Sequence, residues 1–90
     1  MSEAYEAEPA DVEALVADAL AAANEETDPV LRDIILAGQR ELFYAASRRI
    51  AAERARNAVT MHDSGMSYAK IGEALNLTRA RAQQLVEAGR

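Results

Sequence analysis

The spacing of apolar residues predicts a helix near the start of the chain. Between residues 9 and 24, apolar side chains recur at intervals of three and four, which places them in one narrow stripe. Pro9 suits the first turn of such a helix, and Asp11 and Glu13 are favourable beside its positive end. We therefore expect an amphipathic helix whose outer face is acidic.

A second and much longer helix is predicted to follow. Asp28 can cap its first turn with a carboxylate oxygen, and Pro29 suits the first helical position. The helical pattern then continues to Ser64 and Gly65, over about 35 residues or ~50 Å at 1.5 Å per residue. Gly38 is its one weak point and leaves two interpretations open, a kink or a close contact with another helix.

The last part of the chain, residues 66–90, has the pattern of a helix-turn-helix, with the end of the long helix as its support. Ser67 and Thr78 are suited to cap the two short helices, because each hydroxyl can accept a hydrogen bond from a free amide. Asn76 lies where the turn requires a left-handed residue. Gly89 marks the end of the second short helix.

The inner faces of the two short helices combine apolar residues with small ones. The residues expected to face inward are Tyr68, Ile71, Gly72 and Leu75 in the first helix, Leu77 in the turn, and Ala82, Leu85 and Val86 in the second helix. Gly72 and Ala82 are small where the helices are expected to approach most closely. A larger side chain at either position would push the pair apart.

The outward face of the second short helix has the chemistry of a DNA major-groove reader. Gln can bond the edge of adenine, Arg can grip guanine or a phosphate, and an Ala methyl can touch a thymine methyl. The predicted base-reading residues are Arg79, Ala80, Gln83 and Gln84. The predicted phosphate contacts are Ser67, Lys70, Thr78, Arg81, Arg54 and Arg56. For the arginines that precede the turn, a solvated face paired with Glu53 is the alternative.

Two segments of this part, GMSYAKIG at residues 65–72 and TRARAQQL at residues 78–85, resemble the helix-turn-helix of region four of bacterial sigma factors. They are also similar to small regulators of actinobacteria and their phages that carry such a module behind a longer helix. The resemblance covers residues 54–88 and implies promoter DNA as the ligand of the second helix. Ala80 stands where sigma factors have an acidic base-reading residue, and Gln83 replaces a basic one, so the sigma sequence preference is not carried over.

The charge is divided unevenly along the chain. The net charge of the chain is −5. All ten Lys and Arg residues lie within residues 29–90, whereas every charged side chain in residues 1–28 is acidic. DNA phosphates interact with the charge of the nearby surface rather than with the net charge of the whole chain. Residues 29–90 therefore remain suited to binding DNA. The acidic helix is interpreted as a solvated surface, with a surface for a basic partner as the alternative.

The composition offers little for enzyme chemistry. The chain has no cysteine, and His62 is its single histidine, so no ordinary zinc site is expected. No Ser-His-Asp set, Cys-His pair or Gly-rich phosphate loop is apparent. We expect neither catalysis nor a metal or cofactor. A secretory leader and an apolar run long enough to span a bilayer are also absent, so the expected location is cytoplasmic.

The long helix carries an apolar belt that one short helix cannot cover. On a chain of 90 residues such a belt is more often an oligomer interface than exposed surface. We therefore predict a homodimer in which this belt and the first helix pack against their symmetry mates. The predicted interface residues are Leu31, Ile34, Ile35, Leu42, Phe43, Ala46 and Ile50.

These features together predict an all-α fold in three parts: a flexible acidic terminus at residues 1–8, a helical dimerisation region at residues 9–53, and a helix-turn-helix DNA-binding region at residues 54–90. The predicted function is sequence-specific binding of double-stranded DNA as a dimeric transcriptional regulator, with the long helix setting the half-site separation. The alternative is a protein-interaction module with the same fold that binds RNA polymerase or another regulator.

Overall fold

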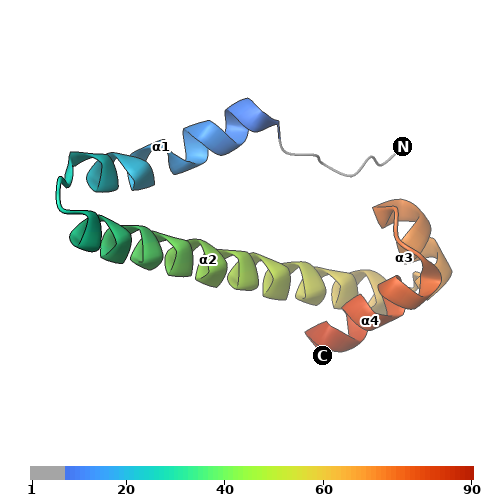
Figure 1. Ribbon diagram of the computed structural model, residues 1–90. Helices are drawn as coiled ribbons and strands as arrows, with labels where there is room; N and C mark the ends of the chain where they lie inside the picture. Colours follow the sequence, from blue (N-terminus) through green and yellow to red (C-terminus); the bar gives the residue numbers. More distant parts are fainter. Residues whose placement is uncertain (1–7) are drawn as a thin grey trace. The chain divides into compact units, whose positions relative to one another are not determined.

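The computed structural model describes residues 8–90, and this part of the chain is all-α, as predicted (Figure 1). The helices are α1 (Pro9–Glu25), α2 (Pro29–Asp63), α3 (Tyr68–Leu75) and α4 (Arg79–Gly89). The predicted flexible terminus lies outside the described residues, apart from Glu8. None of the helices in residues 8–90 is long and apolar enough to cross a lipid bilayer.

Helix α2 begins as its sequence predicts. The Asp28 carboxylate accepts a hydrogen bond from the Val30 amide at 2.9 Å, with Pro29 as the first helical residue. The side chain of Arg32 donates to the Glu26 carbonyl through Nε at 3.1 Å and Nη2 at 2.8 Å. The helix continues through Gly38, where a Cβ atom would meet no other atom within 4 Å. Among residues 8–90, no segment therefore requires a glycine there.

The described chain divides into two compact units, and the division falls inside α2. One unit comprises residues 8–46, and the other comprises Ser47–Arg90. In the first unit the only buried side chain is that of Ala23. The second unit buries a larger set, namely Ala55, Ala58, Ile71, Ala82 and Val86. The hydrophobic core of the described chain thus lies in the helix-turn-helix and its supporting helix.

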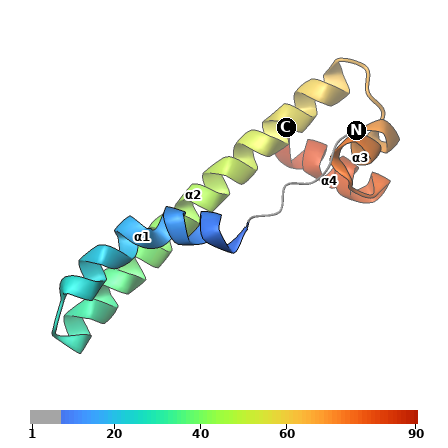
Figure 2. The ribbon, with the colours of Figure 1, turned by 90° about the horizontal axis from the view of Figure 1, so that it is seen from above.

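Three helices contribute to the core of the second unit. The end of α2 lies beside α3 and α4 (Figure 2). The centre of the core is formed by Ala58 from α2, Ile71 from α3, and Ala82 and Val86 from α4. Partly buried side chains surround this centre: Val59, Met61, Met66, Tyr68, Leu75 and Leu85. The predicted inner faces and the supporting role of the end of α2 are therefore confirmed.

Two glycines allow backbone segments to approach closely. A Cβ atom on Gly72 would lie 2.6 Å from the Leu77 carbonyl oxygen, so the close approach is to the turn rather than to the body of α4. A Cβ atom on Gly89 would overlap the carbonyl group of Ala55 and lie 2.9 Å from the Arg56 nitrogen. Gly89 therefore does more than end α4: it lets the last turn of α4 lie against the backbone of α2.

Candidate nucleic-acid interface

The turn between α3 and α4 is held by the residues predicted to form it. The Ser67 hydroxyl accepts from the Lys70 amide, and the Thr78 hydroxyl accepts from the Arg81 amide, both at 3.1 Å. Asn76 has φ 58°, in the left-handed region. The two predicted caps and the left-handed turn residue are thus confirmed. Ser67 caps the start of α3, whereas Asn76 and Thr78 define the turn and the start of α4. Each capping hydroxyl keeps its proton, which it can still donate to a phosphate.

The predicted base-reading residues lie on the outward side of α4, but they differ in exposure and in their hydrogen bonds within the chain. Arg79, Ala80 and Gln84 are exposed, whereas Gln83 is half-buried. The Gln83 amide nitrogen donates to the Glu87 carboxylate one turn later, at 3.0 Å. This bond occupies one donor of Gln83, so Gln84 is the glutamine that presents its amide more openly.

A basic hollow lies between α2 and α4. Its volume is about 210 Å³, and it is lined by Arg54, Leu77, Arg81, Gln84 and Leu85. Within residues 8–90, neither Arg54 nor Arg81 has a carboxylate within ion-pairing distance. The hollow therefore combines two unpaired guanidinium groups with an amide over an apolar floor, an arrangement that suits a phosphate group.

The other predicted phosphate contacts from α2 and α3 are partly balanced by acidic neighbours. Arg56 Nη2 lies 2.7 Å from a Glu53 carboxylate oxygen, and Arg49 pairs with the same oxygen. The hydrogen bond from Arg49, together with the nearby charge of Arg56, lowers the pKa of the Glu53 carboxyl. Lys70 Nζ lies 3.8 Å from the Glu73 carboxylate. For Arg56 the structure therefore favours the alternative of a solvated, paired face, whereas Arg54 remains unpaired.

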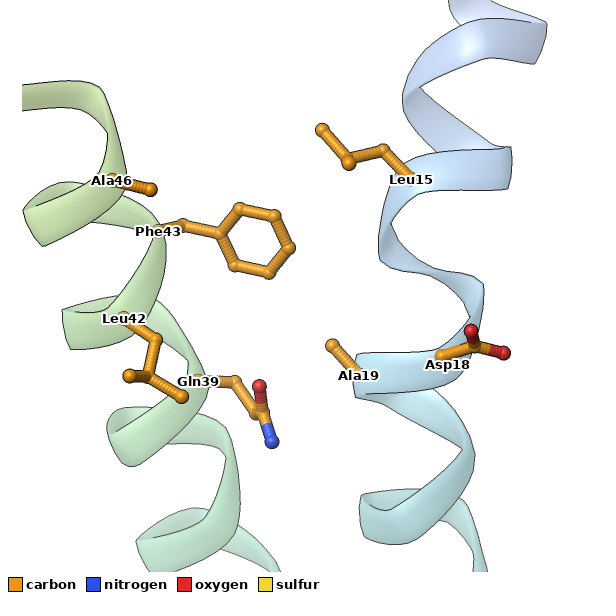
Figure 3. A pocket seen from close by; sticks show the side chains of 7 residues that line it. All are labelled: Leu15, Asp18, Ala19, Gln39, Leu42, Phe43 and Ala46. Carbon is orange, nitrogen blue, oxygen red and sulfur yellow. The ribbon is translucent and has the colours of Figure 1, made fainter. Parts of the chain in front are cut away.

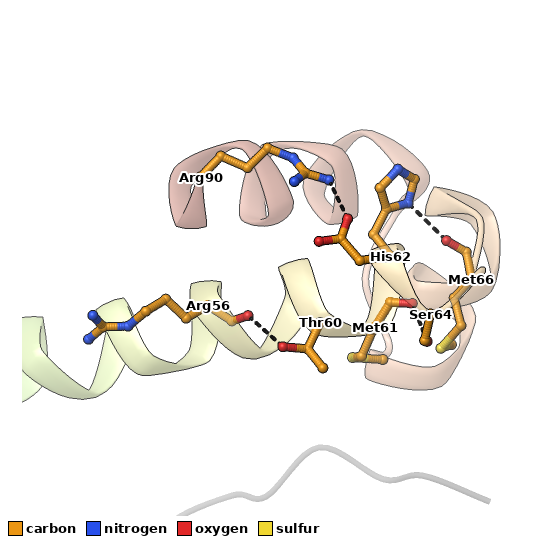
Figure 4. Close-up of polar contacts among 8 residues, drawn as sticks. Arg56, Thr60, Met61, His62, Ser64, Met66 and Arg90 are labelled. Atoms are coloured by element: carbon orange, nitrogen blue, oxygen red, sulfur yellow. Dashed lines mark hydrogen bonds and ion pairs between the residues drawn. The ribbon is translucent and has the colours of Figure 1, made fainter.

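His62, Tyr68 and Arg79 form a group that sequence reasoning missed. The rings of His62 and Tyr68 stack with centroids 4.4 Å apart and planes 8° apart. His62 Nδ1 is 2.9 Å from the Met66 carbonyl oxygen (Figure 4). The Arg79 guanidinium carbon lies 5.8 Å from the centre of the Tyr68 ring. The three residues come from the ends of three helices, so no periodicity within one helix could have linked them.

An ion pair connects the residue after α4 to the last residue of α2. Arg90 Nη2 lies 2.9 Å from the Asp63 carboxylate, so the residue after α4 is tied to the end of α2 (Figure 4). This bond raises the pKa of the Arg90 guanidinium. Both side chains are about half exposed, so the pair contributes little to the stability of the fold.

Protein-family models, curated proteins and solved structures yield no match to this chain. The likeness to region four of sigma factors therefore remains a prediction from residues 54–88 alone.

Most of the predicted interface residues expose their apolar side chains in the single chain. Ile34, Leu42 and Ile50 are 61%, 63% and 69% exposed, respectively. Leu31, Phe43 and Ala46 are also exposed, and Ile35 is half-buried. Single exposed apolar residues are common, whereas several of them along one helix are unusual on the surface of a monomer.

An open groove of about 450 Å³ lies between α1 and α2 in the first unit. Leu15 and Phe43 point toward one another across it (Figure 3). The remaining lining residues are Asp18, Ala19, Gln39, Leu42 and Ala46. The groove is thus mainly apolar, with one carboxylate and one amide among its lining residues. Three of the predicted interface residues, Leu42, Phe43 and Ala46, also line it.

Proposed function

We propose that this chain is a sequence-specific regulator of transcription that binds double-stranded DNA by placing α4 in the major groove. The observation that carries the proposal is the division of α4 into two faces. Ala82 and Val86 are fully buried against α3 and the end of α2, whereas Arg79, Ala80 and Gln84 are exposed together. A rigidly held helix that presents Arg, Gln and Ala has the groups that read base edges.

The basic hollow supports the same function from the phosphate side. Arg54 reaches it from α2 and Arg81 from α4, so both guanidinium groups lie beside the exposed face of α4. Phosphate contacts from two helices fix the register of a recognition helix, although they carry no sequence information themselves. The likeness of residues 54–88 to region four of sigma factors is a further argument for DNA as the ligand.

The uncovered apolar surface of the first unit supports a homodimer. One short recognition helix reads only a few base pairs, whereas two helices at a fixed separation read a palindrome. A second copy that packs against the exposed side chains of α1 and α2 would remove them from water and supply the second recognition helix.

DNA binding is tested by fluorescence anisotropy on DNA from upstream of the protein's own gene and on scrambled DNA, over a salt series. We expect tight, salt-dependent binding that prefers the upstream fragment. Gln84→Ala should lose about 1–3 kcal/mol of that preference, because its amide is expected to bond a base. Arg81→Ala should weaken binding to both fragments and reduce the salt slope by about one, because its contact is to a phosphate.

Arg49→Ala is the matched control, because Arg49 is exposed, lies outside the basic hollow and is already paired with Glu53. It should leave both affinity and preference unchanged. Equal, weak binding to the two fragments at physiological salt would contradict the proposal.

Dimerisation is tested by equilibrium sedimentation. The wild-type chain should be dimeric at micromolar concentration, and Ile34→Glu or Leu42→Glu should shift it to monomer, because each buries a charge in an apolar interface. Ala51→Glu adds the same charge at an exposed position of α2 that has no predicted interface residue three or four positions away, so it serves as the control. A monomeric wild-type chain would exclude the dimer while leaving the DNA-binding test unaffected.

A protein-interaction module is the second candidate, and the charge of α1 favours it. All charged side chains of residues 8–28 are acidic, and the adjacent apolar stripe is exposed at Val12, Leu15 and Leu20. In that case RNA polymerase or another regulator would be the partner. Reversing the charge of Arg79 and Arg81 should abolish DNA binding if the first function holds, and should spare partner binding if the second does.

A further inference from the structure

We propose that Tyr68, backed by His62, is a positioning residue that holds the Arg79 guanidinium in the orientation in which it reads a base. The inference rests on the proposed function, since it assigns a role within the same recognition surface. It also gives His62, which sequence reasoning left without a function, a place in that surface.

The Tyr68 ring is itself held in place. Tyr68 is the first residue of α3, directly after the Ser67 cap, and its side chain is half-buried against the core of the second unit. His62 stacks on it at 4.4 Å with nearly parallel planes. The His62 ring is in turn fixed by the 2.9 Å contact of its Nδ1 with the Met66 carbonyl. The pair therefore forms a rigid flat surface beside the start of α4.

Arg79 places its guanidinium over the Tyr68 ring and has no competing charged partner among the described residues. It is exposed at the first position of α4, and within residues 8–90 its side chain makes no ion pair. Its guanidinium carbon lies 5.8 Å from the Tyr68 ring centre, within the range of a cation–π interaction. A flexible arginine loses side-chain entropy when it binds, and prior contact with a ring reduces that loss.

Such a contact leaves the reading edge of the guanidinium available. A contact with one ring does not engage all five N–H donors of the guanidinium, because these donors are spread around the plane of the group. Arg79 can therefore keep its contact with Tyr68 while two donors bond the edge of a guanine. Arg81 differs, because it lines the basic hollow and faces no aromatic ring among the described residues. The two arginines thus divide base reading and phosphate binding between them.

The test is a selection of duplexes from a random library with the full chain, followed by affinity measurements on the consensus. Arg79→Ala identifies the position that Arg79 reads, as the one position whose preference disappears. Tyr68→Leu should reduce the preference at that same position about two- to fivefold, in line with an exposed cation–π contact, and leave the other positions intact. Tyr68→Phe keeps the ring and should retain the preference.

A double-mutant cycle separates positioning from a general structural role. In the Arg79→Ala background, Tyr68→Leu should have no further effect on the preference at that position. His62→Leu removes the backing ring without altering Tyr68, so it should give a smaller loss at the same position. It also keeps the test possible if Tyr68→Leu fails to fold.

The outcomes distinguish the inference from the function on which it rests. If the wild-type chain enriches no sequence, the proposed function fails. If it enriches a consensus but Tyr68→Leu and His62→Leu weaken all positions equally, or Arg79→Ala loses no position, the function stands and the inference is wrong. An equal effect of Tyr68→Leu with and without Arg79 would also overturn it, because Tyr68 would then act only as a core residue.

Discussion

Gly72→Ala is expected to destabilise the helix-turn-helix by about 2 kcal/mol or more, although alanine is the better helix former. The added Cβ atom would lie 2.6 Å from the Leu77 carbonyl oxygen and 3.2 Å from that of Thr78. Both atoms belong to the backbone of the turn, which cannot rotate away like a side chain. The Leu77 amide also donates to the Gly72 carbonyl at 2.7 Å, so a shift of the turn would strain this bond as well.

Urea denaturation followed by circular dichroism measures this loss, and Gly38→Ala is the matched control. A Cβ atom on Gly38 would meet nothing within 4 Å. The same substitution there should stabilise the protein by about 1 kcal/mol through helix propensity alone. If Gly72→Ala were as stabilising as Gly38→Ala, the close packing of the turn on α3 would be wrong.

Ile71→Ala is expected to cost about 3 kcal/mol, within the usual range for removing a fully buried aliphatic side chain. Ile71 has no exposed surface, and the centre of its cluster holds only Ala58, Ala82 and Val86 besides. Truncation of this side chain would therefore leave a cavity at the centre of the cluster. A loss of this size is a large fraction of the stability of so small a unit, so much of the population should unfold at moderate temperature.

Ile34→Ala is the control for Ile71→Ala, because it makes the same change on α2 where the side chain is 61% exposed. In a sample dilute enough to be monomeric, it should cost less than about 1 kcal/mol. Thermal unfolding of both variants under these conditions provides the comparison. Equal losses at the two positions would contradict the difference in burial on which the core assignment rests.

The helix ends could be predicted from the sequence because they depend on local chemistry. Asp28, Ser67 and Thr78 cap their helices with side-chain oxygens that reach amides two or three residues away. Asn76 takes up the left-handed turn for the same local reason. The inner faces of α3 and α4 also followed from periodicity, since a short helix on a core has one buried side.

The contacts of the candidate site could not be predicted, because they join residues that are distant in the sequence. The contact of Gly89 with the backbone of Ala55 depends on how α4 lies on α2. The meeting of Arg54 and Arg81 in one hollow has the same cause. Spacing also could not separate Arg56, which pairs with Glu53, from the unpaired Arg54 two residues before it.

The scarcity of buried side chains in residues 8–46 has a consequence for how the proposed regulator would respond to its own abundance. With Ala23 as its one buried residue, this unit gains little from folding as a single copy. If a second copy covers the exposed side chains, folding and association become one event, whose extent rises with the square of the free chain concentration. Occupancy of a palindromic site would then increase steeply once enough chain has accumulated, which gives the cell a threshold without any small-molecule signal.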